Sequence, residues 1–230
     1  MRHGPVGLPL FGMNSSAGSP VVVVLAAGPG SRFRGEGHKL AQRLGDTTVL
    51  GATLSLVVSV GLPLVVVTTA ALESLVQEVV AAKDIVLVPA LDGLSTEPLG
   101  QGYSIAAGVN ARAQAGGWLV LPGDMPLVHP NTLRAVLRAM HQAPIVMAQY
   151  RGRRRHPVGF SQELYMELCA LTGEDGVRRL MSRYPAHEVD VEDAGLSFDI
   201  DTQATLHSAR EYQLAAPRLP VLAMPPPLLP

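Results

Sequence analysis

Blocks of apolar residues alternate with blocks of mixed polarity along the middle of the chain. Residues 21–25 are apolar at every position, as in a parallel-sheet strand that is buried on both faces. Similar patterns predict further strands at 64–68, 85–88, 118–121, 145–150, 157–160, 189–191 and 198–201. Helical spacing predicts helices at 48–60, 71–82, 101–113, 131–141, 161–171, 174–184 and 204–214. The alternation predicts an α/β protein with a doubly wound, mainly parallel sheet and helices on both faces.

The two ends of the chain differ in composition from its middle. Residues 1–19 are rich in Gly, Pro and Ser and lack the long apolar stretch of a secretory signal, which predicts a flexible extension. Residues 216–230 alternate Pro with apolar residues and are expected to form a Pro-rich tail. Residues 20–215 are expected to form one domain, because a chain with 47% apolar residues can bury a large core.

Charge and cysteine content narrow the class of protein. A net charge of −1 gives no support for nucleic-acid binding. The most apolar region, 49–67, is interrupted by Gly61 and Pro63, so no membrane span is expected. The single cysteine, Cys169, cannot form an internal disulfide, which favours a reducing, cytoplasmic location.

A glycine-rich segment, 26–30, follows the first predicted strand. Its small residues let backbone N–H groups approach a ligand closely, and Arg32 and Lys39 then add positive charge. The dinucleotide fingerprint is excluded because Phe33 stands at its third glycine, and the kinase-type P-loop because Glu36 stands at its lysine. The pattern predicts a polyphosphate cradle. The alternative is a tight strand-to-helix turn without a ligand, with both cations simply solvated.

Carboxylates follow two other predicted strands. Asp124 lies between Pro122 and Pro126 just after a buried strand, where an aspartate is costly unless it is paired or bound to metal. Mg²⁺ takes one or two protein carboxylates together with phosphate oxygens. Asp199 and Asp201 would share one face of a strand, so one of them is a candidate second ligand. The alternatives are that Asp124 caps the following turn or pairs with a surface arginine, and that Asp201 or Thr202 caps the last helix.

Seven motifs occur together in the order typical of one enzyme family. They are Leu25-Ala-Ala-Gly28, Lys39-Leu40, Gly100-Gln-Gly-Tyr-Ser-Ile105, Gly123-Asp-Met-Pro126, His156-Pro-Val-Gly-Phe160, Gly173-Glu-Asp-Gly176 and Asp199-Ile-Asp-Thr202. With these motifs, residues 21–206 resemble the MobA-like NTP transferases, and among them the molybdenum cofactor cytidylyltransferases. The resemblance implies a Rossmann-like, nucleotide-diphospho-sugar transferase fold. It also implies transfer of CMP from CTP to molybdopterin with release of pyrophosphate.

The resemblance assigns roles to particular residues. Arg32 and Lys39 would hold the triphosphate, and Asp124 would hold Mg²⁺ with help from Asp199 or Asp201. The residues that would contact the nucleotide are Leu25, Ala26, Ala27, Gly28, Gly30, Ser31, Gly102 and Ser104. A second alanine at position 27, where guanylyl relatives carry glycine, favours CTP over GTP.

The acceptor side is expected at the basic segment 151–157, with Arg153, His156 and Pro157 as candidates. The alternatives are a solvated hairpin, favoured for at least two of the arginines, and simple packing of His156. Two features depart from the family: residues 34–38 lengthen the loop before Lys39, and Arg155 replaces a common glycine.

Three other functions remain open at this point. They are a guanylyltransferase that uses GTP, a transferase acting on a sugar or alditol phosphate, and a non-catalytic carrier of the cofactor. A molybdenum hydroxylase apoenzyme is a partner implied by the family alone.

Overall fold

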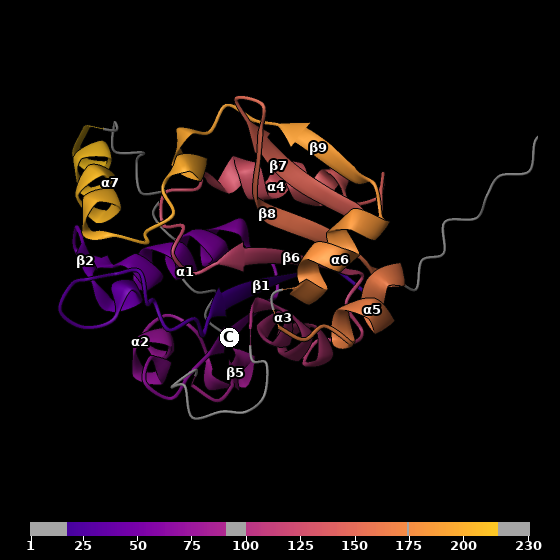
Figure 1. Cartoon of the computed structure of the whole chain (residues 1–230), viewed down its shortest axis with the longest axis horizontal. Coiled ribbons are helices and arrows are strands. Elements are labelled where there is room, and N and C mark those ends of the chain that lie inside the picture. Colours follow the sequence, from indigo (N-terminus) through magenta and orange to yellow (C-terminus); the bar gives the residue numbers. More distant parts are fainter. Residues whose placement is uncertain (1–17, 91–99, 174, 216–230) are drawn as a thin grey trace, which may run out of the picture.

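The computed structural model describes residues 18–90, 100–173 and 175–215. The predictions for 1–17 and for the tail at 216–230 lie outside the described residues. In the described part, one sheet of seven strands runs through the molecule (Figure 1). In sheet order the strands are β5 (Ile85–Leu87), β4 (Leu64–Thr68), β1 (Val21–Ala26), β6 (Gly117–Pro122), β8 (Arg153–Ser161), β7 (Ile145–Tyr150) and β9 (Ala186–Asp190).

The sheet is mainly parallel, as the sequence predicts. β1 pairs in parallel with β4 and β6, and β7 pairs in parallel with β9, whereas β8 is antiparallel to both of its neighbours. Chain order reverses its direction through the sheet at β1, because β4 lies on one side of it and β6 on the other. In open α/β sheets, such a switch point creates a crevice beyond the carboxyl ends of the strands.

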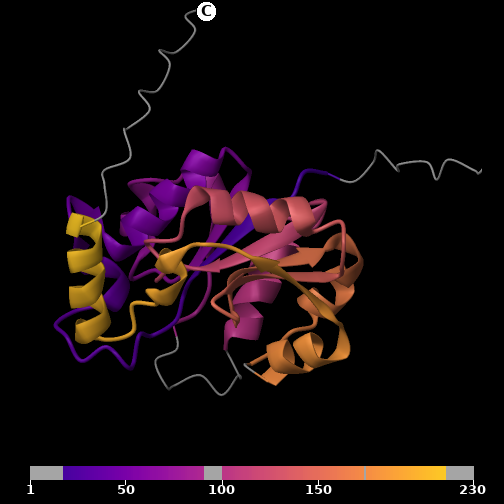
Figure 2. The same ribbon diagram turned by 90° about the horizontal axis from the view of Figure 1, so that it is seen from above.

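Helices cover both faces of the sheet (Figure 2). One face carries α1 (Val49–Val60), α2 (Glu73–Gln77) and α4 (Pro130–Ala139), and the other carries α3 (Gln101–Asn110), α5 (Tyr165–Cys169) and α6 (Asp175–Arg183). α7 (Gln203–Ala215) packs beside a two-stranded ribbon of β2 (Arg43–Leu44) and β3 (Thr47–Thr48). Val22 and Val24 of β1 face the α1 side and Val21 and Val23 the α3 side, which is why the whole strand is apolar.

Local sequence signals explain where α1 begins and ends. The Thr48 side chain accepts a hydrogen bond from the Gly51 N–H, at 3.0 Å, as an N-cap. Gly61 ends the helix in the left-handed region with φ 77°, a conformation that glycine adopts without a Cβ clash.

Several predicted elements are shorter or longer in the structure. The helix expected at 71–82 is only the short helix α2, and a 3₁₀ turn, η2 (Ala82–Asp84), follows further along the chain. The helix expected at 161–171 is a 3₁₀ turn, η3 (Gln162–Leu164), followed by α5. β9 begins three residues before the strand predicted at 189–191.

The strand expected at 157–160 begins earlier, at Arg153. It can do so because β7 and β8 are joined by the two-residue turn Arg151-Gly152, in which both residues have positive φ (51° and 71°). Such turns match the twist of a hairpin. The basic residues therefore belong to a hairpin, with Arg153 and Arg154 exposed.

The prediction of a strand at 198–201 is wrong. This segment follows a 3₁₀ turn, η4 (Ala194–Ser197), and has no strand partner among the described residues. Instead, the Ile200 N–H donates to the Asp124 carbonyl at 3.0 Å, and the Asp201 N–H donates to the Asp199 carbonyl at 2.9 Å. The two carboxylates therefore do not share a strand face.

Within the described residues, no helix is long and apolar enough to span a bilayer.

Candidate active site

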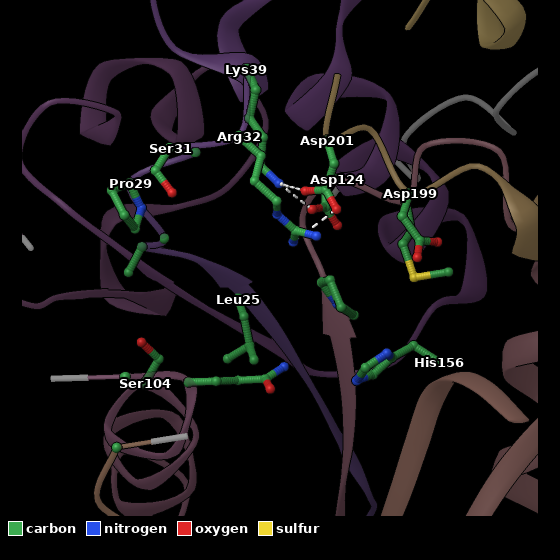
Figure 3. A pocket seen from close by; sticks show the side chains of 18 residues that line it. Leu25, Pro29, Ser31, Arg32, Lys39, Ser104, Asp124, His156, Asp199 and Asp201 are labelled. Carbon is green, nitrogen blue, oxygen red and sulfur yellow. Dashed lines mark hydrogen bonds and ion pairs between the residues drawn. The ribbon is translucent and has the colours of Figure 1, made fainter. Parts of the chain in front are cut away.

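A cavity of about 580 Å³ opens beyond the carboxyl ends of β1 and β6 (Figure 3). The two strands end side by side because Leu25 is paired with Pro122 in the parallel register. The loops that follow them, with the glycine segment and with Asp124, therefore leave the sheet at neighbouring points. The cavity is lined by Leu25, Ala27, Gly28, Pro29, Gly30, Ser31, Arg32, Lys39, Gly100, Gln101, Ser104, Pro122, Asp124, Met125, His156, Gly173, Asp199 and Asp201.

The glycine segment forms a turn closed by a hydrogen bond from the Phe33 N–H to the Gly30 carbonyl, at 2.9 Å. Gly30 has a φ of 63°, and a Cβ there would lie 3.1 Å from Cγ of Lys39. The glycine is thus required both by the backbone conformation and by the close passage of the lysine stem.

Lys39 begins the 3₁₀ turn η1 (Lys39–Ala41), and His38 fixes its start. Nδ1 of His38 accepts from the Leu40 N–H at 3.1 Å, so Nε2 carries the proton and donates to the Gly28 carbonyl at 3.0 Å. His38 thereby ties the long 34–38 loop back to the glycine segment. This tie explains how Lys39 enters the cavity despite the longer loop.

The Lys39 ammonium lies between two carboxylates. Its Nζ is 2.5 Å from Oδ2 of Asp124 and 2.7 Å from Oδ1 of Asp201. The three side chains are 11%, 17% and 21% exposed, so water screens these ion pairs only in part. Burial by itself would lower the pKa of Lys39, but the charges and hydrogen bonds of the two aspartates raise it above its ordinary value.

Arg32 approaches the same carboxylates from the solvent side. It makes an ion pair of 2.8 Å with Oδ2 of Asp201 while its own side chain is 77% exposed. An exposed pair of this kind adds little to stability, and the guanidinium is free to turn toward a ligand. In Figure 3, Arg32 and Lys39 both point at the Asp124–Asp201 pair.

Asp199 lines the cavity but makes no ion pair within the described residues. Burial raises the pKa of Asp199, and the negative charge of Asp124 adds to the rise, while Arg155 and Lys39 oppose it.

The donor set fits a hard divalent cation. The Asp124 and Asp201 carboxylates already converge on one cation, the Lys39 ammonium, and carboxylate oxygens are the ligands that Mg²⁺ and Mn²⁺ accept. The sequence predicts Asp124 with either Asp199 or Asp201 as metal ligands, and no group of three or more metal-binding side chains occurs in the described ranges. A cation here would take the two converging carboxylates and complete its shell with phosphate and water oxygens.

A buried carboxylate fastens the two aspartate-bearing loops together. Asp193 accepts hydrogen bonds from the His129 N–H (2.8 Å), the Thr132 hydroxyl (2.6 Å) and the Gly195 N–H (2.9 Å). A Cβ at Gly195 would overlap the Leu127 carbonyl, so the segments touch backbone to backbone. The sequence analysis missed Asp193, because nothing in its neighbourhood marks it as a residue that links distant loops.

His156 also lines the cavity. Burial lowers the pKa of His156 to about 4, although the charge of Asp124 works against the shift, so the ring is neutral at pH 7. Nε of the neighbouring Arg155 is buried and has no hydrogen-bond partner among the described residues. Arg153 is exposed and Pro157 is buried, and neither lines the cavity.

Twelve predicted site residues line the cavity and four do not. The four are Ala26, Gly102, Arg153 and Pro157. Ala26 is buried in the core, and Gly102 packs against the Gly173 carbonyl, to which its N–H donates at 2.9 Å. The sequence analysis did not name the lining residues Pro29, Gly100, Gln101, Pro122, Met125 and Gly173 as site residues, although each lies in or beside one of its motifs.

Comparison with known proteins agrees with this geometry. Residues 22–189 match the family model described as MobA-like NTP transferase domain. The crystal structure of Rv0371c from Mycobacterium tuberculosis in complex with manganese is similar, with 31% identity, a TM-score of 0.68 and coverage of 85% of this chain and 99% of that one. The fold also matches molybdopterin-guanine dinucleotide biosynthesis protein A from Archaeoglobus fulgidus, with 18% identity, a TM-score of 0.64 and coverage of 85% and 100%.

The bifunctional protein GlmU of Zymomonas mobilis is 32% identical over 120 residues, which are 52% of this chain and 26% of GlmU. The chain thus spans only about a quarter of that relative. The family model, by contrast, covers most of the described residues, and the cavity lies beyond the carboxyl ends of the strands, where open α/β sheets bind ligands. The chain belongs to the MobA-like NTP transferase domain family.

Proposed function

We propose that this protein transfers CMP from CTP to the terminal phosphate of molybdopterin and releases pyrophosphate. The observation that carries nucleotidyl transfer is the convergence of Lys39, Asp124 and Asp201 beside the glycine segment. The choice of CTP and molybdopterin rests on the order of the motifs and on the alanine at position 27. The reaction uses soluble substrates, and we place it in the cytoplasm.

The reaction needs positioned charge rather than a nucleophilic side chain. An oxygen of the acceptor phosphate attacks the α-phosphorus in line, a new P–O bond forms, and the bond to the β-phosphate oxygen breaks as pyrophosphate leaves. Negative charge grows on the leaving pyrophosphate, and Arg32 and Lys39 stabilise it together with backbone N–H groups at 28–31. Mg²⁺ held by Asp124 and Asp201 would supply further neutralisation of phosphate charge.

The remaining walls of the cavity suit a nucleoside on one side and an acceptor on the other. Leu25 and Ala27 offer apolar contacts to a base, and the start of α3 presents Gln101 and Ser104 as hydrogen-bonding groups. Neutral His156 lies on the opposite wall, where it can accept or donate a hydrogen bond to the acceptor without adding charge.

The test is pyrophosphate release with molybdopterin and Mg²⁺, with CTP, GTP, ATP and UTP compared at equal concentration. Release with CTP and not with the other three is the expected result. Release with GTP alone would agree with the proposed phosphate and metal site but would show that the base is guanine and not cytosine. If none of the four nucleotides yields pyrophosphate, the proposed reaction with molybdopterin is contradicted.

One observation favours a second candidate. The family commonly carries glycine at position 155, and Arg155 there adds a positive charge beside His156. A sugar or alditol phosphate is therefore the alternative acceptor. Replacing molybdopterin with such a phosphate in the same assay separates the two.

If CTP binds but no acceptor yields pyrophosphate, the protein carries the cofactor to a partner such as a molybdenum hydroxylase apoenzyme.

A further inference from the structure

Lys39 stands where a divalent cation would bind. Its ammonium touches both carboxylates that face the cavity, at 2.5 and 2.7 Å, and its side chain is only 11% exposed. Arg32 pairs with only one of the two carboxylates, that of Asp201, and is 77% exposed. Of the two basic residues, only Lys39 holds its charge inside the carboxylate pair rather than at the solvent edge.

An ammonium and a divalent cation cannot share the two oxygens. Like charges a few ångströms apart in a partly buried site repel strongly, because water screens them only in part. A metal ion that entered alone would displace Lys39 from both aspartates and leave a half-buried charge without a partner, which is strongly unfavourable. Binding of a free metal ion is therefore unfavourable for two reasons: the Lys39 ammonium repels the ion, and both ion pairs of Lys39 are lost.

A polyphosphate removes this opposition. The Lys39 stem passes over Gly30, whose missing Cβ leaves the lysine Cγ close to the turn. Phosphate oxygens held at this turn would give the ammonium a new anionic partner within the same cavity, and the carboxylates would then be free for the metal. The lysine would exchange one set of anions for another without becoming unpaired.

We propose that Lys39 makes this site reject free divalent metal and accept it only together with a nucleotide polyphosphate. The inference rests on the proposed function, since it uses the same carboxylates and the same phosphate cradle. The ligand recognised is the metal–polyphosphate complex, and Lys39 is the residue that selects it over the bare ion. The ammonium thereby couples metal binding to nucleotide binding.

The test measures Mn²⁺ binding to the full-length protein without nucleotide, by the loss of the free Mn²⁺ signal in electron paramagnetic resonance. Lys39→Met should bind Mn²⁺ at least about tenfold more tightly than the wild type, because a half-buried positive charge has been removed from the site. The same variant should show a higher KM for Mg·CTP. A purely structural role for Lys39 predicts that both metal and nucleotide binding weaken.

Three controls accompany it. Lys39→Arg keeps the charge and should keep Mn²⁺ binding as weak as in the wild type. Lys83→Met removes the other lysine of the chain, which is exposed, and should change nothing. Adding Asp124→Asn to Lys39→Met should abolish the gain.

Equal Mn²⁺ affinity in the wild type and Lys39→Met would overturn the inference. If circular dichroism shows that Lys39→Met is unfolded, Lys39→Gln replaces it. The wild type gives a second measurement: its spectrum should show protein-bound Mn²⁺ only after a non-hydrolysable CTP analogue is added, and bound Mn²⁺ beforehand would contradict the proposal. A failure of the proposed function is distinguishable from a failure of this inference, because it would appear as no pyrophosphate release with any of the four nucleotides.

Discussion

At the residue scale, the two aspartates that face Lys39 differ in what else they hold. The Asp201 carboxylate pairs with both Lys39 and Arg32, whereas the Asp124 carboxylate pairs with Lys39. The main chain of Asp124 also receives the hydrogen bond from the Ile200 N–H, at 3.0 Å. Asp124 therefore supplies a carboxylate to the cavity through its side chain, and its main chain holds the segment that carries Asp201 in position.

Asp124→Asn should lower the rate of pyrophosphate release by at least about a hundredfold, since an amide loses the charge that binds a cation while keeping the shape. The backbone hydrogen bond from Ile200 survives, so circular dichroism and the unfolding midpoint should change little. Asp84→Asn is the matched control, because Asp84 pairs with Arg112 at 2.6 Å and does not line the cavity. Unchanged turnover in Asp124→Asn would contradict the metal assignment.

His156 should make the protein sensitive to mild acid. Its pKa in the folded protein is about 4 against an ordinary 6.5, so between these pH values the unfolded chain binds a proton that the folded one does not. Stability should fall as the pH drops through this window and level off below pH 4. The loss from this group is about 3.5 kcal/mol at most, since one pKa unit is worth about 1.4 kcal/mol.

Urea unfolding of His156→Gln at pH 7, 5 and 4 checks this. The variant should lose less stability than the wild type over that range, whatever its stability at pH 7. His207→Gln, at an exposed position of α7, should follow the wild-type curve. Parallel curves for His156→Gln and the wild type would show that another group causes the acid sensitivity.

At the scale of elements, the start of α3 forms one wall of the cavity because it is docked against the loop that precedes α6. The Gly102 N–H donates to the Gly173 carbonyl, and a Cβ at Gly102 would lie 2.5 Å from that oxygen. Ser104, two residues later and on another side of the same helical turn, instead faces the cavity. The first turn of α3 thus uses one side for packing and another to line the cavity.

Gly102→Ala should cost about 1–3 kcal/mol of stability, because the added methyl group forces α3 away from the loop. Ser104→Ala should leave the unfolding free energy within about 0.5 kcal/mol and raise the KM for CTP. Chemical denaturation and steady-state kinetics on both variants separate the two roles. A stable Gly102→Ala with a raised KM would instead restore the predicted contact between Gly102 and the nucleotide.

Elements buried on both faces were the most predictable from sequence. β1, β4 and β6 are continuous apolar runs, and all three were expected close to their observed positions. The segment 198–201 was not, because its alternation of apolar and acidic residues imitates a strand. Its conformation is set by a hydrogen bond to Asp124, far away in the chain, and by burial of Ile200, which local pattern does not reveal.

At the scale of the molecule, the cavity is built from both ends of the domain. Leu25 and Lys39 come from its first part and Asp199 and Asp201 from its last. Sequence motifs identified most of these residues. Their mutual placement, with Lys39 between two carboxylates, depends on the path of the 34–38 loop and on the Asp193 hydrogen bonds, and neither follows from sequence periodicity.

A ligand that bridges both ends should stabilise the whole fold. Mg·CTP at a hundredfold excess over its Kd would add about 2.7 kcal/mol, or roughly 5–10 °C in Tm for a domain of this size. Thermal unfolding with and without Mg·CTP measures this, with Asp124→Asn as the variant that should show a smaller shift. A shift with another nucleotide and none with CTP would contradict the choice of CTP.

The ion pair between Lys39 and Asp201 joins residues 162 positions apart, and this separation matters during synthesis. At ribosomal rates of roughly 5–20 residues per second, roughly 10–30 s pass between the synthesis of the glycine segment and the addition of Asp201 to the chain. Until then Lys39 lacks one of its two anions and the cavity lacks its last wall. We therefore expect the proposed nucleotide site to be incomplete for most of the synthesis of the chain and to form only when the domain is nearly finished.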